Sequence, residues 1–147
     1  ISNTPPADLE LGVRHAAVLI ANDYEMQKLA ELTGLQPDHL AAETPLHITT
    51  MGKDGAIIRG YLAEQPLQIP AAPVTAVVDP TGAGDAWRAG FFAGLHQGKD
   101  LATAGAMAAV SAAYVVEQKG GQSHFFTPDQ FAERLAAYQA RFHPSAA

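Results

Sequence analysis

The chain has 147 residues, 48% of them hydrophobic, and carries 9 Lys and Arg residues against 15 Asp and Glu residues. This length suits one folded domain that buries roughly two-thirds of its unfolded surface, and the apolar fraction excludes wholesale disorder. Because the chain has no cysteine, a disulfide scaffold, a thiolate zinc site and thiol catalysis are excluded. The net charge of -6 argues against a nucleic-acid partner bound by a broad basic face.

No segment is predicted to cross a membrane. The longest weakly polar stretch, Leu101–Val116, is mostly Ala, Gly, Ser and Thr and is shorter than the roughly 20 apolar residues that a span needs, so we expect a buried helix there. No charged start followed by an apolar stretch marks a signal peptide. We therefore expect a soluble, cytoplasmic protein. Its first residue is Ile1 rather than Met, as in a piece of a longer protein.

The first half of the chain alternates between strand and helix patterns. Residues 2–8, with two prolines, are interpreted as a loose end. Residues 16–21 (AAVLIA) are typical of a strand buried on both faces, and a helix is expected from residue 23 to about residue 32, closed by Gly34. Turn residues at 52–55 favour a hairpin. The further short strands that we expect are residues 46–51, 56–62, 67–69 and 75–78.

From Gly82 onward the pattern becomes helical, with helices expected at residues 83–97 and 101–117. Residues 127–130 (TPDQ) signal another helix, because they supply an N-cap, a proline at the first helical position and a capping-box Gln. Strands mixed with helices predict an α/β fold with helices over the sheet, and no composition shift marks a second domain. The apolar residues that recur on one face of the last helix are Phe131, Leu135, Tyr138 and Phe142.

Residues 79–86 (DPTGAGDA) predict an anion-binding turn between an apolar strand and a helix. Unpaired N–H groups at a helix start carry partial positive charge, and Gly82 and Gly84 let a phosphoryl group approach the backbone. Asp85 would repel phosphate, so its useful role is to accept a proton from an attacking hydroxyl. The alternative is a tight turn in which Asp85 only complements the helix dipole. Walker A is absent, and Trp87 interrupts the dinucleotide fingerprint, which disfavours hydride transfer.

Residues 79–91 resemble the second signature of the ribokinase-like (PfkB) carbohydrate and nucleoside kinases. Three other stretches are similar to family motifs in family order: residues 22–25 (NDYE), the nucleotide loop 50–55 (TMGKDG) and the base-closing loop 119–122 (KGGQ). The resemblance favours bacterial adenosine kinase-like members. It implies a Rossmann-like three-layer α/β/α sandwich of the ribokinase type, in which residues 1–147 are the C-terminal nucleotide-binding and catalytic part of a single domain.

The resemblance also implies roles for individual residues. Asp85 matches the catalytic base, and the three residues before it match the anion hole for the γ-phosphoryl group of ATP. Asn22 and Glu25 match positions that organise Mg²⁺, with Glu25 acting through water; alone, they read as a capping box. Periodicity alone reads residues 50–55 as a hairpin corner. The implied anion hole is Gly82, Ala83 and Gly84, and the implied nucleotide contacts are Thr50, Gly52, Gly55, Ala109 and Gly120.

A monovalent cation site, for K⁺ in many members, is implied as well. His124 stands where a serine often completes that site, and this departure puts the site in question. The sequence leaves three alternatives for Arg88: it pairs with a carboxylate, it contacts phosphate, or it lies unpaired at the surface. The implied cation ligands are Asp79, Thr81, Val115, Gln118, Gly120 and His124.

The remaining histidines and the aromatic residues after Asp85 have no expected role in the site. The histidines interpreted as surface or loop residues are His15, His39, His47, His96 and His143. The expected core aromatics are Trp87, Phe91 and Phe92.

The predicted function is ATP-dependent transfer of a phosphoryl group to a hydroxyl of a sugar or nucleoside. A non-catalytic nucleotide-binding or regulatory module of the same fold is the alternative. The resemblance implies that the N-terminal half, with the substrate-binding residues and the β lid, is absent, so we expect these residues alone to phosphorylate nothing and to need that half covalently or as a partner chain. Homodimerisation, if it occurs, would use the absent lid.

Overall fold

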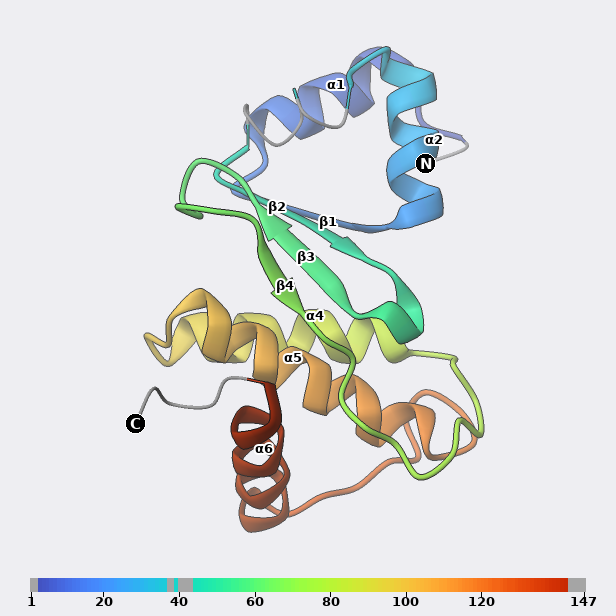
Figure 1. Ribbon diagram of the computed structural model, residues 1–147. Helices are drawn as coiled ribbons and strands as arrows, with labels where there is room; N and C mark the ends of the chain where they lie inside the picture. The colour runs from blue at the N-terminus through green and yellow to red at the C-terminus, as the bar shows by residue number, and fades with distance from the viewer. Residues whose placement is uncertain (1–2, 37–38, 40–43, 143–147) are drawn as a thin grey trace. The chain divides into compact units, whose positions relative to one another are not determined.

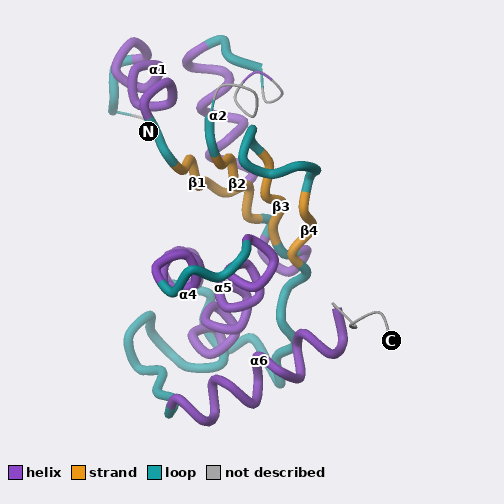
Figure 2. The backbone as a smooth tube through the Cα atoms, turned by 90° about the vertical axis from the view of Figure 1, so that its left-hand side faces the viewer, coloured by secondary structure: helices purple, strands orange, loops and turns teal. Residues whose placement is uncertain are grey.

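The chain forms two compact units, residues 1–68 and 69–147, in the computed structural model, which describes residues 3–36, 39 and 44–142 (Figure 1). The first unit is built on strands, and the second is helical (Figure 2). The elements of the first unit are α1 (Pro6–His15), β1 (Val18–Asn22), α2 (Asp23–Thr33), β2 (Leu46–Thr50), a 3-10 turn (Gly52–Asp54) and β3 (Ala56–Arg59). Strand β4 (Leu67–Ile69) lies at the junction, and α4 (Ala83–His96), α5 (Leu101–Val116) and α6 (Pro128–Phe142) follow.

The strands form one mixed sheet in the order β1-β2-β3-β4. Strands β1 and β2 are parallel, with Asn22 opposite Thr50, whereas β2 and β3 are antiparallel, with Thr50 opposite Ala56. Asn22 and Thr50 therefore end neighbouring parallel strands at the same edge of the sheet. In open α/β sheets, this carboxyl edge is where ligands bind.

Helices α1 and α2 lie side by side on one side of the strands (Figures 1 and 2). They enclose a small core that includes Val13, Met26 and Leu29, each at most 6% exposed. Helix α2 ends at Gly34, whose φ of 72° is the left-handed conformation that glycine adopts without strain. The strand, helix and stop predicted for residues 16–34 are thus confirmed, with the strand shifted by about two residues. The expected burial of this strand on both faces is wrong among the described residues, because only Ala21 of β1 is buried.

Helix α1 shows that the loose end expected for residues 2–8 is wrong from Pro6 onward. Proline is well tolerated in the first helical turn, where an N–H has no intrahelical acceptor, and Asp8 in that turn complements the helix dipole. Arg14 pairs with Glu10 one turn earlier at 2.7 Å. Since Val13 packs into the α2 core, tertiary contact stabilises a helix whose prolines suggested a loop.

His47 contradicts its interpretation as a surface or loop residue, because it is 2% exposed on β2. Its Nε2 lies 3.2 Å from the sulfur of Met26, and its Nδ1 has no hydrogen-bond partner among the described residues. Burial, and then the charge of Arg59 opposite it in the sheet, lower the pKa of His47. The surface interpretation is confirmed for His15 and His96. His39 is also exposed, and His143 lies outside the described residues.

We expect the free energy of unfolding to fall as the pH drops through the ordinary histidine pKa of 6.5. Because the folded pKa of His47 is lower than the unfolded one, the unfolded state binds more protons in this window, so acid favours unfolding by at most about 1.4 kcal/mol per pH unit. Urea unfolding followed by circular dichroism between pH 7.5 and 5.5 measures the slope. H47Q should flatten it, and exposed H96Q should not. Equal slopes in both variants would contradict this account.

Residues 75–78 do not form the predicted strand. Their backbone is bound instead to the end of α5: the N–H groups of Val78 and Asp79 donate to the carbonyl of Val116, at 2.7 and 3.2 Å. The side chains of Val77 and Val78 are 65% and 58% exposed. The β-branched composition suggested a strand, but among the described residues the hydrogen-bond partners of this segment come from a helix terminus and not from a strand.

Helices α4 and α5 pack closely because small residues face each other. A Cβ placed on Gly90 would lie 2.7 Å from the carbonyl oxygen of Met107, and one on Gly94 would lie 2.7 Å from the Cα of Ala104. The predicted buried helix is confirmed, since residues 104–110 are all buried. Of the expected core aromatics, Phe92 is 46% exposed, whereas Trp87 and Phe91 are buried and stack.

Helix α6 begins as predicted. The Thr127 hydroxyl accepts from the Gln130 N–H at 3.2 Å, and the Gln130 side chain accepts from the Thr127 N–H at 2.8 Å, which is a capping box. Of the apolar face, Tyr138 is 2% exposed, and its hydroxyl donates to the Pro70 carbonyl. Burial raises the pKa of Tyr138 to about 12.

No helix among the described residues is long and apolar enough to span a bilayer.

Candidate phosphate-binding site

The turn before α4 brings two backbone segments into contact. Gly82 is the N-cap of α4 and has a φ of 83°, a conformation that glycine adopts without strain. A Cβ at this position would lie only 2.8 Å from the Cα of Gly121. Glycine at 82 is therefore required both by its conformation and by the close approach of the 119–124 loop.

Asp79 joins the turn to that loop. Its Oδ1 accepts from the Thr81 N–H and its Oδ2 from the Gly120 N–H, both at 2.9 Å. Hydrogen bonds from the Thr81 side chain and backbone, and then from the Gly120 backbone, lower the pKa of Asp79. The carboxylate is thus an ionised bridge between the two arms of the site.

The N–H groups of this turn fit an anion. Ala83 donates its N–H to the carbonyl of Pro80 at 3.1 Å, so this member of the predicted anion hole already has an acceptor. Within the part of the chain that the structure describes, the N–H groups of Gly82 and Gly84 meet no acceptor. The start of a helix with such free donors attracts phosphate.

A pocket of about 790 Å³ opens beside this turn. Asp85 lines it from the first turn of α4, with a side chain that is 86% exposed. Arg88, one turn later, donates from Nη1 to Asp85 Oδ1 at 2.9 Å, which decides among the alternatives for Arg88 in favour of carboxylate pairing. The pocket is lined by Thr81, Gly82, Asp85, Ala86, Ala89, Gly120, Gly121, Gln122, Ser123 and His124.

Several lining residues were not among the predicted site residues. Ala89 lies one turn after Asp85 and Ala86 one turn after Gly82, so helical spacing from these two predicted residues could have found them. Gly121 is the second glycine of the motif 119–122, and its role shows only when its contact with Gly82 is seen. Gln122 belongs to the motif 119–122 that resembles the base-closing loop, whereas for Ser123 nothing in the sequence beyond adjacency indicated the pocket.

The implied cation ligands are only partly available. The structure brings Asp79, Thr81 and Gly120 together, but both Asp79 carboxylate oxygens already accept N–H groups. The Val115 carbonyl accepts from the Gln118 N–H at 3.1 Å. His124 presents a ring nitrogen where an oxygen would be needed, since hard cations select oxygen ligands. Each of these oxygens keeps a second lone pair that could face a cation, whereas His124 offers no side-chain oxygen, so the K⁺ site stays a prediction.

The remaining predicted residues of the first unit lie together at the carboxyl edge of β1 and β2. Asn22 and Glu25 form the capping box that the residues alone favoured: the Asn22 N–H donates to Glu25 at 2.9 Å, and the Glu25 N–H to Asn22 at 2.7 Å. Thr50 is opposite Asn22, and Gly52 and Gly55 flank the turn after β2, each with positive φ. The side-chain oxygens of Asn22 and Glu25 each accept one of these N–H groups. They can also contact phosphate or the waters of magnesium only where the same oxygens remain accessible to solvent.

Two predicted residues are deep in α5. Ala109 is 5% exposed and Val115 is 0% exposed, so neither lines the pocket. The nucleotide contact of Ala109 stays a prediction. Among the described residues, no three His, Asp or Glu side chains lie together so that they could hold a metal ion.

Known proteins of similar sequence and structure are kinases. Residues 2–128 match the pfkB family carbohydrate kinase domain. A nucleoside kinase of Methanocaldococcus jannaschii is 34% identical over 127 residues, which is 86% of this chain and 41% of that protein. A deoxyribokinase of Salmonella typhi is 32% identical over 145 residues, covering 91% of this chain and 46% of that protein.

A solved structure gives the same result. The nucleoside kinase of Burkholderia thailandensis, in complex with ADP-inosine, superposes with a TM-score of 0.88 at 33% identity, over 92% of this chain and 42% of that one. The chain thus spans less than half the length of these relatives. The resemblance and the α/β fold of the ribokinase type are confirmed. The chain belongs to the pfkB family of carbohydrate kinases.

Proposed function

We propose that this chain is the nucleotide-binding and catalytic part of a kinase that transfers the γ-phosphoryl group of ATP to a hydroxyl, with a nucleoside as the acceptor. One observation carries the proposal: the exposed carboxylate of Asp85 lines the same pocket as Gly82, whose N–H meets no acceptor among the described residues. The names of the relatives at 33–34% identity support a nucleoside over a simple sugar.

The chain's own groups would act as follows. The N–H groups of Gly82 and Gly84 would hold the γ-phosphoryl oxygens and stabilise the charge that develops on them. As the new oxygen–phosphorus bond forms and the bond to the β-phosphate breaks, the proton of the acceptor hydroxyl passes to Asp85 and ADP leaves. Arg88 would hold the Asp85 side chain in place before substrate arrives.

The nucleotide and magnesium would use the sheet edge of the first unit. Asn22 and Glu25 would bind the waters of Mg²⁺, which supplies charge neutralisation of the phosphates. Thr50, Gly52 and Gly55 would follow the nucleotide. These assignments rest on the family motifs and on the shared edge of β1 and β2.

We also propose that residues 1–147 are one part of a single kinase domain that needs further residues for turnover, since the chain spans 41–46% of its curated relatives. Those residues would be supplied on the same polypeptide or as a second chain. The chain alone is expected to bind ATP without transferring phosphate. An active preparation of the 147 residues alone would contradict this proposal.

The test is an ADP-release assay with ATP and Mg²⁺ on the complemented kinase, by which we mean residues 1–147 together with the further residues that turnover needs. Adenosine, inosine, ribose, deoxyribose, fructose and fructose phosphate are compared as acceptors. We expect the highest kcat/KM with a purine nucleoside. ATP binding without ADP release on any acceptor would favour the non-catalytic module, and a sugar preferred over all nucleosides would contradict the acceptor class.

A further inference from the structure

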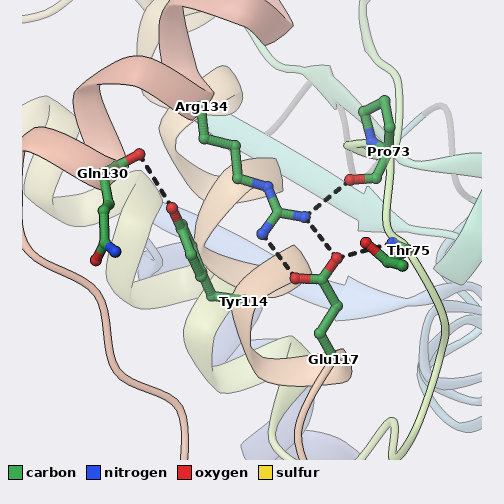
Figure 3. Close-up of polar contacts among 6 residues, drawn as sticks. All are labelled: Pro73, Thr75, Tyr114, Glu117, Gln130 and Arg134. Carbon is green, nitrogen blue, oxygen red and sulfur yellow. Dashed lines mark hydrogen bonds and ion pairs between the residues drawn. The ribbon is translucent and has the colours of Figure 1, made fainter.

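A polar cluster within the second unit links α6 to the segment that leads into the site (Figure 3). Arg134 of α6 binds both carboxylate oxygens of Glu117, at 2.8 and 3.0 Å, and its Nη2 also donates to the Pro73 carbonyl at 2.8 Å. Its guanidinium carbon lies 4.5 Å from the centre of the Tyr114 ring. The Arg134 and Glu117 side chains are only 21% and 20% exposed.

The same carboxylate holds the backbone of the segment before Asp79. Glu117 Oε1 accepts from the Thr75 N–H at 2.9 Å. Val78 is the next residue of this segment that is bound to α5. Its N–H donates to the carbonyl of Val116, the residue directly before Glu117. Residues 73–79 are therefore bound along the end of α5 through Arg134, Glu117 and one helix carbonyl.

Asp79 transmits this placement to the pocket. It follows the bound segment and accepts from Thr81 on one side and Gly120 on the other. Because residues 75–78 form no strand, no sheet ladder fixes their position among the described residues. The position of residues 75–79 thus depends on the contacts at Glu117 and Val116, and with it the position of the Asp79 carboxylate that bridges the anion-binding turn and the 119–124 loop.

The Arg134–Glu117 pair is suited to hold a fixed position. Its two parallel hydrogen bonds and planar guanidinium set the carboxylate orientation in a way that a lysine could not. Partial burial alone raises the pKa of Glu117, but hydrogen bonds from Arg134 and Thr75 and the charge of Arg134 make the net shift downward. The carboxylate is thus ionised at neutral pH and remains an acceptor for Thr75.

We propose that Arg134 and Glu117 are positioning residues for the nucleotide pocket, although neither lines it. The inference rests on the proposed function for its ligand. It requires that losing the pair displaces residues 75–79, loosens the Asp79 bridge and weakens ATP binding by the folded protein. A merely structural pair would lower stability and leave the affinity of the folded fraction unchanged.

The matched control is Y138F. Tyr138 is one turn after Arg134 on α6, and its hydroxyl donates to the Pro70 carbonyl, at 2.8 Å, upstream of the segment. Both R134Q and Y138F therefore remove contacts between α6 and the same stretch of chain, but only R134Q disturbs Glu117. E117A and E117Q add a grading, because the amide oxygen of Gln can still accept from Thr75.

Binding of ATP with Mg²⁺ to the 147-residue chain can be followed by the fluorescence of Trp87, its only tryptophan. Trp87 directly follows the pocket residue Ala86. For R134Q and E117A we expect the dissociation constant to rise on the order of tenfold. The dissociation constant of E117Q should lie between those of these variants and that of wild type. The dissociation constant of Y138F should stay within about twofold of wild type, because this substitution does not move the groups that line the pocket.

Amide hydrogen exchange supplies a readout that does not need the ligand. We expect faster exchange at Thr75, Val78, Thr81 and Gly120 in R134Q and not in Y138F. Unchanged ATP affinity and unchanged exchange at these amides in R134Q would overturn the inference while leaving the proposed function intact. A wild-type chain that binds no ATP would overturn both.

Discussion

Replacing Asp85 by Asn is expected to lower kcat of the complemented kinase by about 10²–10⁴-fold, the usual contribution of a general base. The amide cannot accept the hydroxyl proton, although it has nearly the shape of the carboxylate. ATP affinity should change little or rise slightly, because a negative charge beside the phosphate site is removed. Kinetic constants from ADP release and ATP titration of the same preparation measure the two effects.

The control for this variant is D129N. Asp129 also lies in the first turn of a helix, α6, so it shares with Asp85 any favourable interaction with a helix dipole. If Asp85 acts only through the dipole, both variants should lose similar small amounts of stability and keep their turnover. If Asp85 is the base, only D85N loses turnover. Near-normal kcat in D85N would exclude the proposed mechanism.

Arg88 adds a condition to this prediction. In the structure, its Nη1 is 2.9 Å from Asp85 Oδ1, and the pair is exposed, at 40% and 86%. Such a pair contributes little to stability. In D85N the guanidinium would lose its partner and could bind phosphate more strongly. A tighter dissociation constant for ATP in D85N would therefore agree with the proposal, provided that turnover is lost.

Short-range sequence signals predicted the residues of the pocket better than the long-range contacts that hold the surrounding segments in place. The glycines and Asp85 lie at the start of a helix, and their residue types and order along the chain were enough to predict an anion-binding turn there. The capping residues at Asn22 and Thr127 were also predictable, because a cap and the N–H group that donates to it are three residues apart. Each of these features involves partners that are close along the chain.

The errors have the opposite cause. Residues 75–78 have strand composition, but their partners, Val116 and Glu117, are about forty residues further along the chain. His47 carries a polar ring, which favoured a surface position, and its burial against Met26 shows only in the structure. Such long-range contacts leave no periodic trace in a single sequence.

The contact between α4 and α5 yields the second large expected effect. We expect G90V to unfold the second unit or to destabilise it by about 3 kcal/mol or more, the upper range for overpacking. A Cβ at position 90 would meet Ser111 Oγ at 2.5 Å, the Met107 carbonyl oxygen at 2.7 Å and the Ala108 Cα at 2.8 Å. Two of these atoms belong to the backbone of α5, so relief requires the helices to separate.

The milder variant G90A tests the same contact quantitatively. In an unobstructed helix, Gly to Ala stabilises by about 0.5–1 kcal/mol, and Gly12 in α1 offers that reference, since a Cβ added there would have nothing within 4 Å. Urea unfolding by circular dichroism, with Trp87 fluorescence for the second unit, compares them. G12A should be stabilising and G90A destabilising. If both stabilise equally, α4 and α5 cannot be packed as closely as the structure has them, and Gly90 is then only a weak point in helix propensity.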